Sequence, residues 1–150
     1  MAALIKNIAN YVTNPIDKIT DQLYLGSIRG IESKYLKKHN IHTVISMTDK
    51  AYEYNLTNVV TKHYIYAIND HNTSQNALDV MKPAIIKHIK DTIRNHNNVL
   101  IHCDCGLHRS ATVVVYYLQH IGMTCDDSIK IVRNKRYFAL IRRPFRLELI

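Results

Sequence analysis

A chain of 150 residues has the length of one domain, and with 47% hydrophobic and 21% charged residues its composition is that of a globular protein. Four glycines and three prolines exclude collagen-like and low-complexity classes, and no apolar run reaches the roughly 18 residues of a membrane span. A net charge of +8 indicates an anionic partner. An odd count of three cysteines makes a disulfide framework improbable, and the first residues lack the apolar core of a signal peptide. We therefore expect a cytoplasmic protein. We expect no membrane partner.

Hydrophobic periodicity predicts strands that alternate with helices in a single domain over 1–150. Helical spacing of apolar residues or good first-turn residues predicts helices over 2–13, 31–39, 75–95, 110–121 and 126–135. Short apolar or β-branched runs predict strands over 23–25, 42–46, 64–68 and 99–101. This alternation indicates an α/β domain with a largely parallel sheet.

The stretch from Val99 to Ser110 predicts a strand, a six-residue loop and a helix. A loop that enters a helix N-terminus turns its backbone N–H groups inward, which makes a nest for a tetrahedral anion such as phosphate. The predicted phosphate-binding residues are Asp104, Cys105, Gly106, Leu107, His108 and Arg109.

Catalytic chemistry is expected where this loop begins and ends. Arg109 offers a guanidinium that matches phosphate geometry, and the positive field of the nest predicts a thiolate at Cys103. A thiolate beside a phosphate nest is placed for in-line attack on phosphorus, which gives a phosphocysteine intermediate. The hydroxyl of Ser110 can hydrogen-bond the sulfur and ease its departure in a second step.

The pattern His102-Cys103-x5-Arg109-Ser110 resembles the signature of the cysteine-dependent protein tyrosine phosphatases. Segments 21–27, 42–47, 68–70 and 133–148 resemble the dual-specificity branch, and most of all its compact poxviral and other viral members. The resemblance implies a three-layer α/β domain, with a mostly parallel sheet of about four or five strands flanked by helices. It also implies a shallow pocket that admits phosphotyrosine, phosphoserine and phosphothreonine.

A general acid must protonate the leaving oxygen from a separate loop. Asp70 follows a predicted strand and lies 33 residues before Cys103, near the spacing that the resemblance implies. The alternative is that Asp70 only caps the helix predicted over 75–95.

Three loop residues depart from the family's common pattern. We expect Asp104 to point outward and favour basic substrate flanks; the alternative is that it points inward and slows the enzyme. We expect Cys105 to be a small buried side chain; the alternative is a redox partner for Cys103. His108 either adds to the positive field of the predicted phosphate site or only lines the rim of that site. No metal-ligand spacing is found, so neither a metal nor another cofactor is expected.

Three functions remain open: a dual-specificity protein phosphatase, a phosphatase for RNA 5′ phosphates or phosphoinositides, and a non-catalytic phospho-binding module. A dual-specificity protein phosphatase is expected to have phosphorylated proteins as partners. The positive charge of segment 129–150 leaves nucleic acid as an alternative partner, for a phosphatase that acts on RNA. The arm over 2–13 packs on its own domain or, as viral relatives suggest, forms a homodimer. A viral chain would act in the host-cell cytoplasm or the virion.

Overall fold

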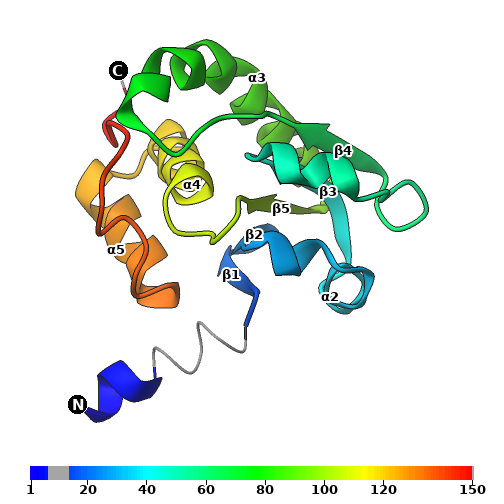
Figure 1. The fold of residues 1–150 in the computed structure, drawn as a ribbon, viewed down its shortest axis with the longest axis horizontal. Coiled ribbons are helices and arrows are strands. Elements are labelled where there is room, and N and C mark those ends of the chain that lie inside the picture. Colours follow the sequence, from blue (N-terminus) through cyan, green and yellow to red (C-terminus); the bar gives the residue numbers. More distant parts are fainter. Residues whose placement is uncertain (7–13, 150) are drawn as a thin grey trace.

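The computed structural model describes residues 1–6 and 14–149, and its centre is a five-stranded sheet (Figure 1). In spatial order the strands are β1 (Ile16–Thr20), β2 (Leu23–Gly26), β5 (Asn98–His102), β3 (Ile41–Ser46) and β4 (Lys62–Ile65). β1 is antiparallel to β2, and all other neighbouring strands are parallel. The predicted α/β class with a mostly parallel sheet is confirmed.

Helices cover both faces of this sheet. They are α2 (Ser33–Lys38), α3 (Gln75–Arg94), α4 (Arg109–His120) and α5 (Cys125–Lys135), joined by the 3-10 turns η1 (Ile28–Ile31), η2 (Asp49–Glu53) and η3 (Asn72–Ser74). The three long helices match their predicted ranges to within one residue at each end. The helix predicted over 31–39 is shorter, because η1 occupies its first residue and α2 ends at Lys38.

The alternation of side chains along each strand divides the core into two layers. On β5, Val99 and Ile101 pack with α3, α4 and α5, whereas Leu100 points to the other face and packs with Leu36 of α2. α4 is buried over its first ten residues, 109–118, because it lies between the sheet and its neighbours α3 and α5. This central position fixes the start of α4 against the end of β5.

Two strand predictions differ from the structure. β1 is absent from the prediction, because its sequence has charged residues at its centre and only Ile16 and Ile19 turn into the core. The strand predicted over 64–68 lies at 62–65 instead. After one further backbone hydrogen bond, from Tyr66 N–H to the Ser46 carbonyl, the chain leaves the sheet and becomes a loop.

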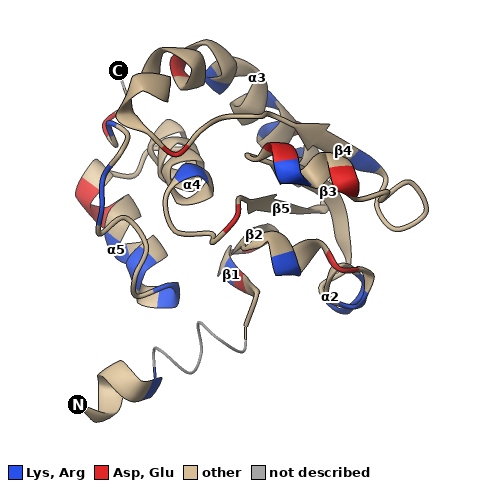
Figure 2. Ribbon diagram, viewed as in Figure 1, with Lys and Arg blue, Asp and Glu red and all other residues tan. Residues whose placement is uncertain are grey.

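The predicted arm over 2–13 lies for the most part outside the described residues. Residues 2–6 are helical and exposed, whereas 7–13 are not described. Within 1–6 and 14–149, no helix combines the length and apolar character needed to span a bilayer. Figure 2 shows that basic residues gather on α5 and on the segment after it, where the sequence predicts an excess of positive charge.

Candidate active site

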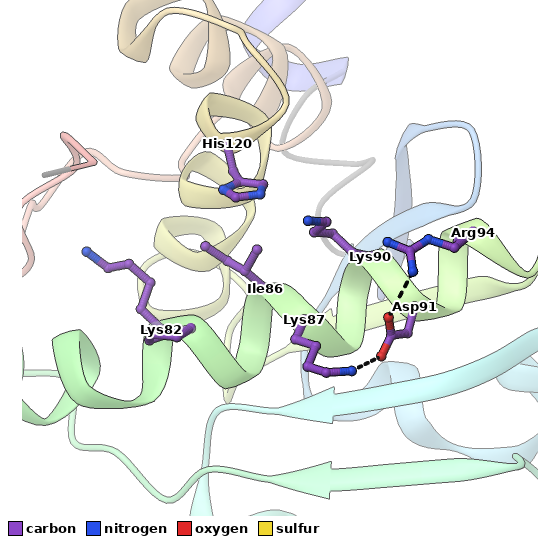
Figure 3. Close-up of a pocket in the computed structure, with 8 residues that line it drawn as sticks. Lys82, Ile86, Lys87, Lys90, Asp91, Arg94 and His120 are labelled. Atoms are coloured by element: carbon purple, nitrogen blue, oxygen red, sulfur yellow. Dashed lines mark hydrogen bonds and ion pairs between the residues drawn. The ribbon is translucent and has the colours of Figure 1, made fainter.

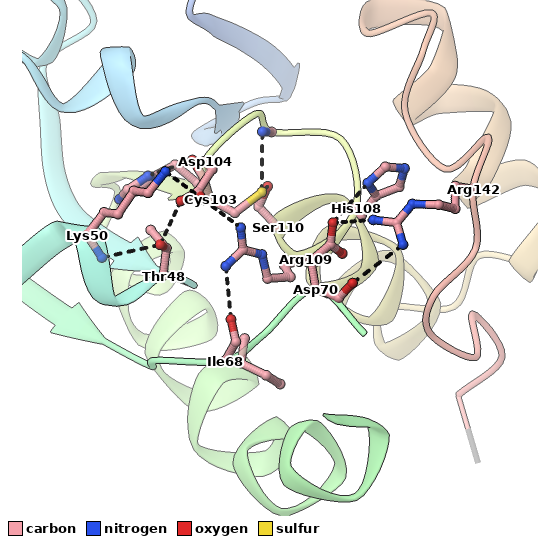
Figure 4. A network of polar contacts seen from close by, with 12 residues as sticks. Thr48, Lys50, Ile68, Asp70, Cys103, Asp104, His108, Arg109, Ser110 and Arg142 are labelled. Carbon is pink, nitrogen blue, oxygen red and sulfur yellow. Dashed lines mark hydrogen bonds and ion pairs between the residues drawn. The ribbon is translucent and has the colours of Figure 1, made fainter. Parts of the chain in front are cut away.

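The loop between β5 and α4 surrounds the sulfur of Cys103 (Figure 4). The Cys103 side chain is buried, and its Sγ lies 3.1 Å from the Ser110 hydroxyl in the first turn of α4. The backbone N–H of Gly106 donates to the same sulfur at 3.3 Å. The sulfur thus lies beside two groups that can stabilise negative charge on it.

Gly106 permits the sharp bend of this loop. Its φ angle of +70° lies in the left-handed region, where a side chain is unfavourable. A Cβ atom there would also lie 2.5 Å from the carbonyl oxygen of Gly26, at the end of β2. The loop therefore rests directly on the backbone of β2, and position 106 has no room for a side chain.

The guanidinium of Arg109 is held at both of its terminal nitrogens, and its third N–H group, at Nε, is unpaired within residues 1–6 and 14–149. Its Nη1 donates to the Ile68 carbonyl at 2.9 Å, and its Nη2 lies 3.1 Å from Asp104 Oδ2. Its Nε is buried and has no partner among the described residues. Buried polar groups normally have a hydrogen-bond partner. We therefore infer that this unpaired N–H donates to an anionic ligand when one is bound.

Asp104 is the centre of a polar cluster that sequence reasoning did not find. Its Oδ1 accepts a hydrogen bond of 2.7 Å from the Thr48 hydroxyl, and its Oδ2 lies 3.2 Å from the Lys50 ammonium as well as near Arg109. Burial alone would raise the pKa of Asp104, but the Thr48 hydrogen bond and the Arg109 charge together lower it below its usual range. The expectation that Asp104 points outward is wrong, because three donors hold its carboxylate.

Asp70 lies in the loop between β4 and η3 and faces the same site. Its Oδ2 is 2.5 Å from Nη2 of Arg142 and 3.4 Å from Nδ1 of His108. Its Oδ1 is buried and has no partner in the described part of the chain. Arg142 comes from the segment after α5, and the only sequence signal for it is the excess of basic residues there.

One cavity of about 210 Å³ brings these side chains together. It is lined by Asp70, Cys103, Cys105, Leu107, His108, Arg109 and Arg142. His108 is at the rim, where burial lowers the pKa of its imidazole and the charge of Asp70 opposes that effect. The structure therefore places the predicted nucleophile, arginine and acid around one hollow. A larger hollow between α3 and α4 shares no residue with this one.

Arg136 anchors the loop from behind and is a second residue that sequence reasoning missed. It is buried, and its Nε and Nη2 donate to the carbonyls of Gly106 and Cys105, each at 3.0 Å. Its Nη1 forms an ion pair of 2.8 Å with Asp17 on β1. These bonds hold two loop carbonyls away from the sulfur, which leaves the opposite, N–H side of the backbone toward it.

His102 supports the loop from inside the sheet. Its Nε2 lies 2.5 Å from the Ser46 hydroxyl, which is also 2.8 Å from Nε2 of His63. Burial lowers the pKa of His102 to about 4, so the ring is neutral near pH 7. A neutral ring can accept one hydrogen bond and donate another, and its Nδ1 lies 3.2 Å from the Cys103 carbonyl.

The cysteines differ in their surroundings. Cys105 is exposed at the cavity, so the expected small buried side chain is wrong at this position. Cys125, at the start of α5, is partly buried. Over residues 1–6 and 14–149, no group of three or more His, Cys, Asp or Glu side chains is arranged to hold a metal ion.

A buried thiol at the end of a central parallel strand, a glycine-containing loop and an arginine at the next helix N-terminus form the arrangement of a cysteine-dependent phosphatase. Residues 23–150 match the family model "Dual specificity phosphatase, catalytic domain". The chain belongs to the dual-specificity phosphatase family, as the sequence resemblance implies.

Relatives by sequence include cellular and viral proteins. Dual specificity protein phosphatase Mpk3 of Drosophila melanogaster is 30% identical over 129 residues, which cover 85% of this chain and 31% of that protein. Protein 123R of Invertebrate iridescent virus 6, which is named as a tyrosine phosphatase, is 31% identical over 121 residues, covering 79% of this chain and 78% of that protein. The chain thus spans about a third of the length of the insect relative and most of the viral one.

A solved structure shares the fold. The human tyrosine phosphatase-like serine/threonine/tyrosine-interacting protein superposes with a TM-score of 0.73 at 22% identity. The match covers 83% of this chain and 85% of that one.

Proposed function

We propose that the protein is a dual-specificity protein phosphatase, which hydrolyses phosphotyrosine and phosphoserine or phosphothreonine in proteins. The observation that carries this proposal is the convergence of Cys103, Arg109 and Asp70 on one cavity of about 210 Å³. Membership of the dual-specificity family supports the breadth of the substrate class.

In the first step, the thiolate of Cys103 attacks phosphorus while the bond from phosphorus to the substrate oxygen breaks. The phosphoryl oxygens accept hydrogen bonds from the loop amides of residues 104–109 and from the buried Nε of Arg109. Asp70 protonates the leaving oxygen, and we assign the proton to Oδ1 because Oδ2 accepts from Arg142.

In the second step, water attacks the phosphocysteine and loses a proton to the Asp70 carboxylate. The bond between phosphorus and sulfur breaks, and inorganic phosphate leaves. Ser110, at 3.1 Å from the sulfur, donates a hydrogen bond to the departing thiolate. No metal or other cofactor takes part in this scheme.

Asp104 acts in this scheme as a positioning residue for Arg109. Its carboxylate engages Nη2, while the Ile68 carbonyl engages Nη1. The guanidinium is therefore fixed before substrate arrives, so less conformational freedom is lost on binding. Cys105, Leu107 and His108 form the rest of the phosphate-binding loop and its rim.

The test is a comparison of hydrolysis rates on a phosphotyrosine peptide, a phosphothreonine peptide, 5′-triphosphate RNA and a phosphoinositide. We expect turnover of both peptides, and loss of that turnover in Cys103→Ser with retained binding of inorganic phosphate, because the loop amides and Arg109 remain. Turnover by Cys103→Ser would refute the covalent mechanism. Faster turnover of the RNA or the lipid would reassign the substrate, and phosphate binding without turnover by the unaltered protein would indicate a binding module.

We also propose that residues 1–150 contain a single catalytic domain, and that the arm over 2–13 joins two copies as a homodimer. The exposed apolar side chains of Leu4 and Ile5 support an interface role for the described part of the arm. A cytoplasmic location, in the host cell or the virion if the chain is viral, agrees with the free thiols of all three cysteines and with the viral relative.

A further inference from the structure

The larger hollow is formed by one face of α3 and the end of α4, and we name it the α3–α4 groove (Figure 3). Its volume is about 510 Å³, more than twice that of the cavity at Cys103. All of its lining residues lie between positions 82 and 94, except His120 at the end of α4. The scheme of hydrolysis uses none of them.

The groove has an apolar floor. Ile86, whose side chain is almost entirely buried, lies at the bottom, and the exposed ring of Pro83 lies beside it. Figure 3 shows the His120 ring above Ile86, on the side of α4. Next to His120, Ile121 exposes 54% of its surface to solvent. An apolar side chain of a partner that packs on this floor would be removed from water, which favours binding.

The rim of the groove is basic. Four cations line it, Lys82, Lys87, Lys90 and Arg94, against one carboxylate, Asp91. Lys82 pairs with Asp79 at 3.3 Å, whereas Asp91 lies 2.6 Å from Lys87 and 3.9 Å from Arg94, so these two cations share one carboxylate. Within the described part of the chain, Lys90 has no acidic partner. The positive charge of the rim is therefore in excess.

We propose that the α3–α4 groove binds an acidic segment of a partner protein. An apolar side chain of that segment packs on Ile86, and its carboxylates pair with Lys90 and Arg94. Lys90 and Arg94 are four residues apart on one helix, which is about 6 Å along its axis. Acidic residues four positions apart on a partner helix would match this spacing.

Other occupants fit the groove less well. A membrane surface does not enter a concave site, and nucleic acid would be expected to find aromatic rings for base stacking, of which the lining offers only His120. A second copy of this chain carries the same net charge of +8, which opposes docking on a basic surface. The described part of the arm ends in Lys6 and contains no carboxylate.

The test measures binding of a fluorescent peptide of about 14 residues, which contains Glu, Asp and Leu at helical spacing. The double variant Lys90→Glu/Arg94→Glu is compared with Lys37→Glu/Lys38→Glu on α2, which changes the net charge equally at another surface. We expect the groove variant to weaken binding by about tenfold or more, and the α2 variant by less than about twofold. Thermal unfolding followed by circular dichroism should be unchanged in both, which shows that they fold.

Two further measurements distinguish binding in the α3–α4 groove from general electrostatic attraction. Replacing Leu by Ser in the peptide should weaken binding about tenfold, because the apolar contact is lost. Equal effects of the two charge reversals, no effect of the Ser replacement, or no binding by the unaltered protein at about 1 mM peptide would overturn the proposal. It would also be overturned if the groove variant loses binding to an oligonucleotide or to phosphatidylserine vesicles but not to the peptide. None of these results depends on phosphatase activity, so the proposed function stands or falls separately.

Discussion

The carboxylate of Asp104 illustrates how a residue next to the proposed nucleophile can act through its partners. Its charge is balanced by Arg109 and Lys50, and its pKa is lowered below the usual range despite partial burial. It is therefore ionised at every pH at which the enzyme is expected to work. A carboxylate that orients the phosphate-binding arginine should affect the rate of the reaction more than the binding of phosphate.

We predict that Asp104→Asn lowers kcat by about tenfold, because the amide cannot replace the charge that holds Nη2 of Arg109. Inhibition by inorganic phosphate should not weaken, because a negative charge beside the anion site is removed. Steady-state kinetics with an aryl phosphate measure both. Asp21→Asn, at a carboxylate that is 98% exposed, is the matched control and should leave both values unchanged. An unchanged kcat, or a parallel loss of phosphate inhibition, would contradict the positioning role.

Asp70→Asn removes the proposed acid but keeps the side-chain size. We predict a loss of about 100-fold on phenyl phosphate, whose leaving group needs a proton, and at most about tenfold on p-nitrophenyl phosphate. The ratio of the two rates in one enzyme preparation is the measurement, so differences in folding cancel. An equal loss on both substrates would mean that Asp70 serves the structure of its loop and not proton transfer.

At the scale of elements, hydrogen-bonding side chains tie three neighbouring strands together. His102 ends β5, Ser46 ends β3 and His63 lies in β4. The pKa of His102 falls to about 4 in the folded chain and returns to about 6.5 on unfolding. As the pH falls from 6.5 to 4, the unfolded chain binds this proton and the folded chain does not, so stability is lost across that window.

We therefore predict that His102→Asn flattens the dependence of folding free energy on pH between 6.5 and 4. The full shift corresponds to about 3 kcal/mol. Urea titrations at several pH values measure it, and His71→Asn, at an exposed histidine, should keep the original pH dependence. If His102→Asn loses stability between these pH values as steeply as the unaltered chain, the loss has another origin.

Most of the elements and the position of the loop that begins at Cys103 could be predicted from local sequence, but the contacts around that loop could not. Long apolar runs and helical stripes identify β5 and α3, and the spacing of Cys103 and Arg109 identifies the loop. β1 depends on pairing with β2, which no local pattern shows. Arg136 reaches the loop from 30 residues away, and Asp104 is oriented by Thr48, 56 residues earlier. Tertiary packing, and not local propensity, decides such contacts.

At the scale of the whole molecule, the described part of the N-terminal arm, residues 1–6, exposes apolar side chains. Met1 and Ile5 expose 94% and 60% of their surface, which is unfavourable unless a partner covers them. We predict that the full chain sediments as a dimer and that a variant lacking residues 1–13 sediments as a monomer. Turnover of a small aryl phosphate should be equal in both. Identical sedimentation of the two would argue against the homodimer.

The segment after α5 reaches the loop that carries Asp70, and this affects where a tag should be attached to the protein. Arg142 engages Asp70, the Arg146 N–H donates to the Gln75 side chain at 2.7 Å, and Gln119 donates to the Leu147 carbonyl at 2.6 Å. An affinity tag or fusion partner attached to this end would be close in sequence to the contacts with the loop that carries Asp70, the proposed proton donor. The unaltered protein and Asp70→Asn should therefore be compared with any tag at the N-terminal end, or without a tag.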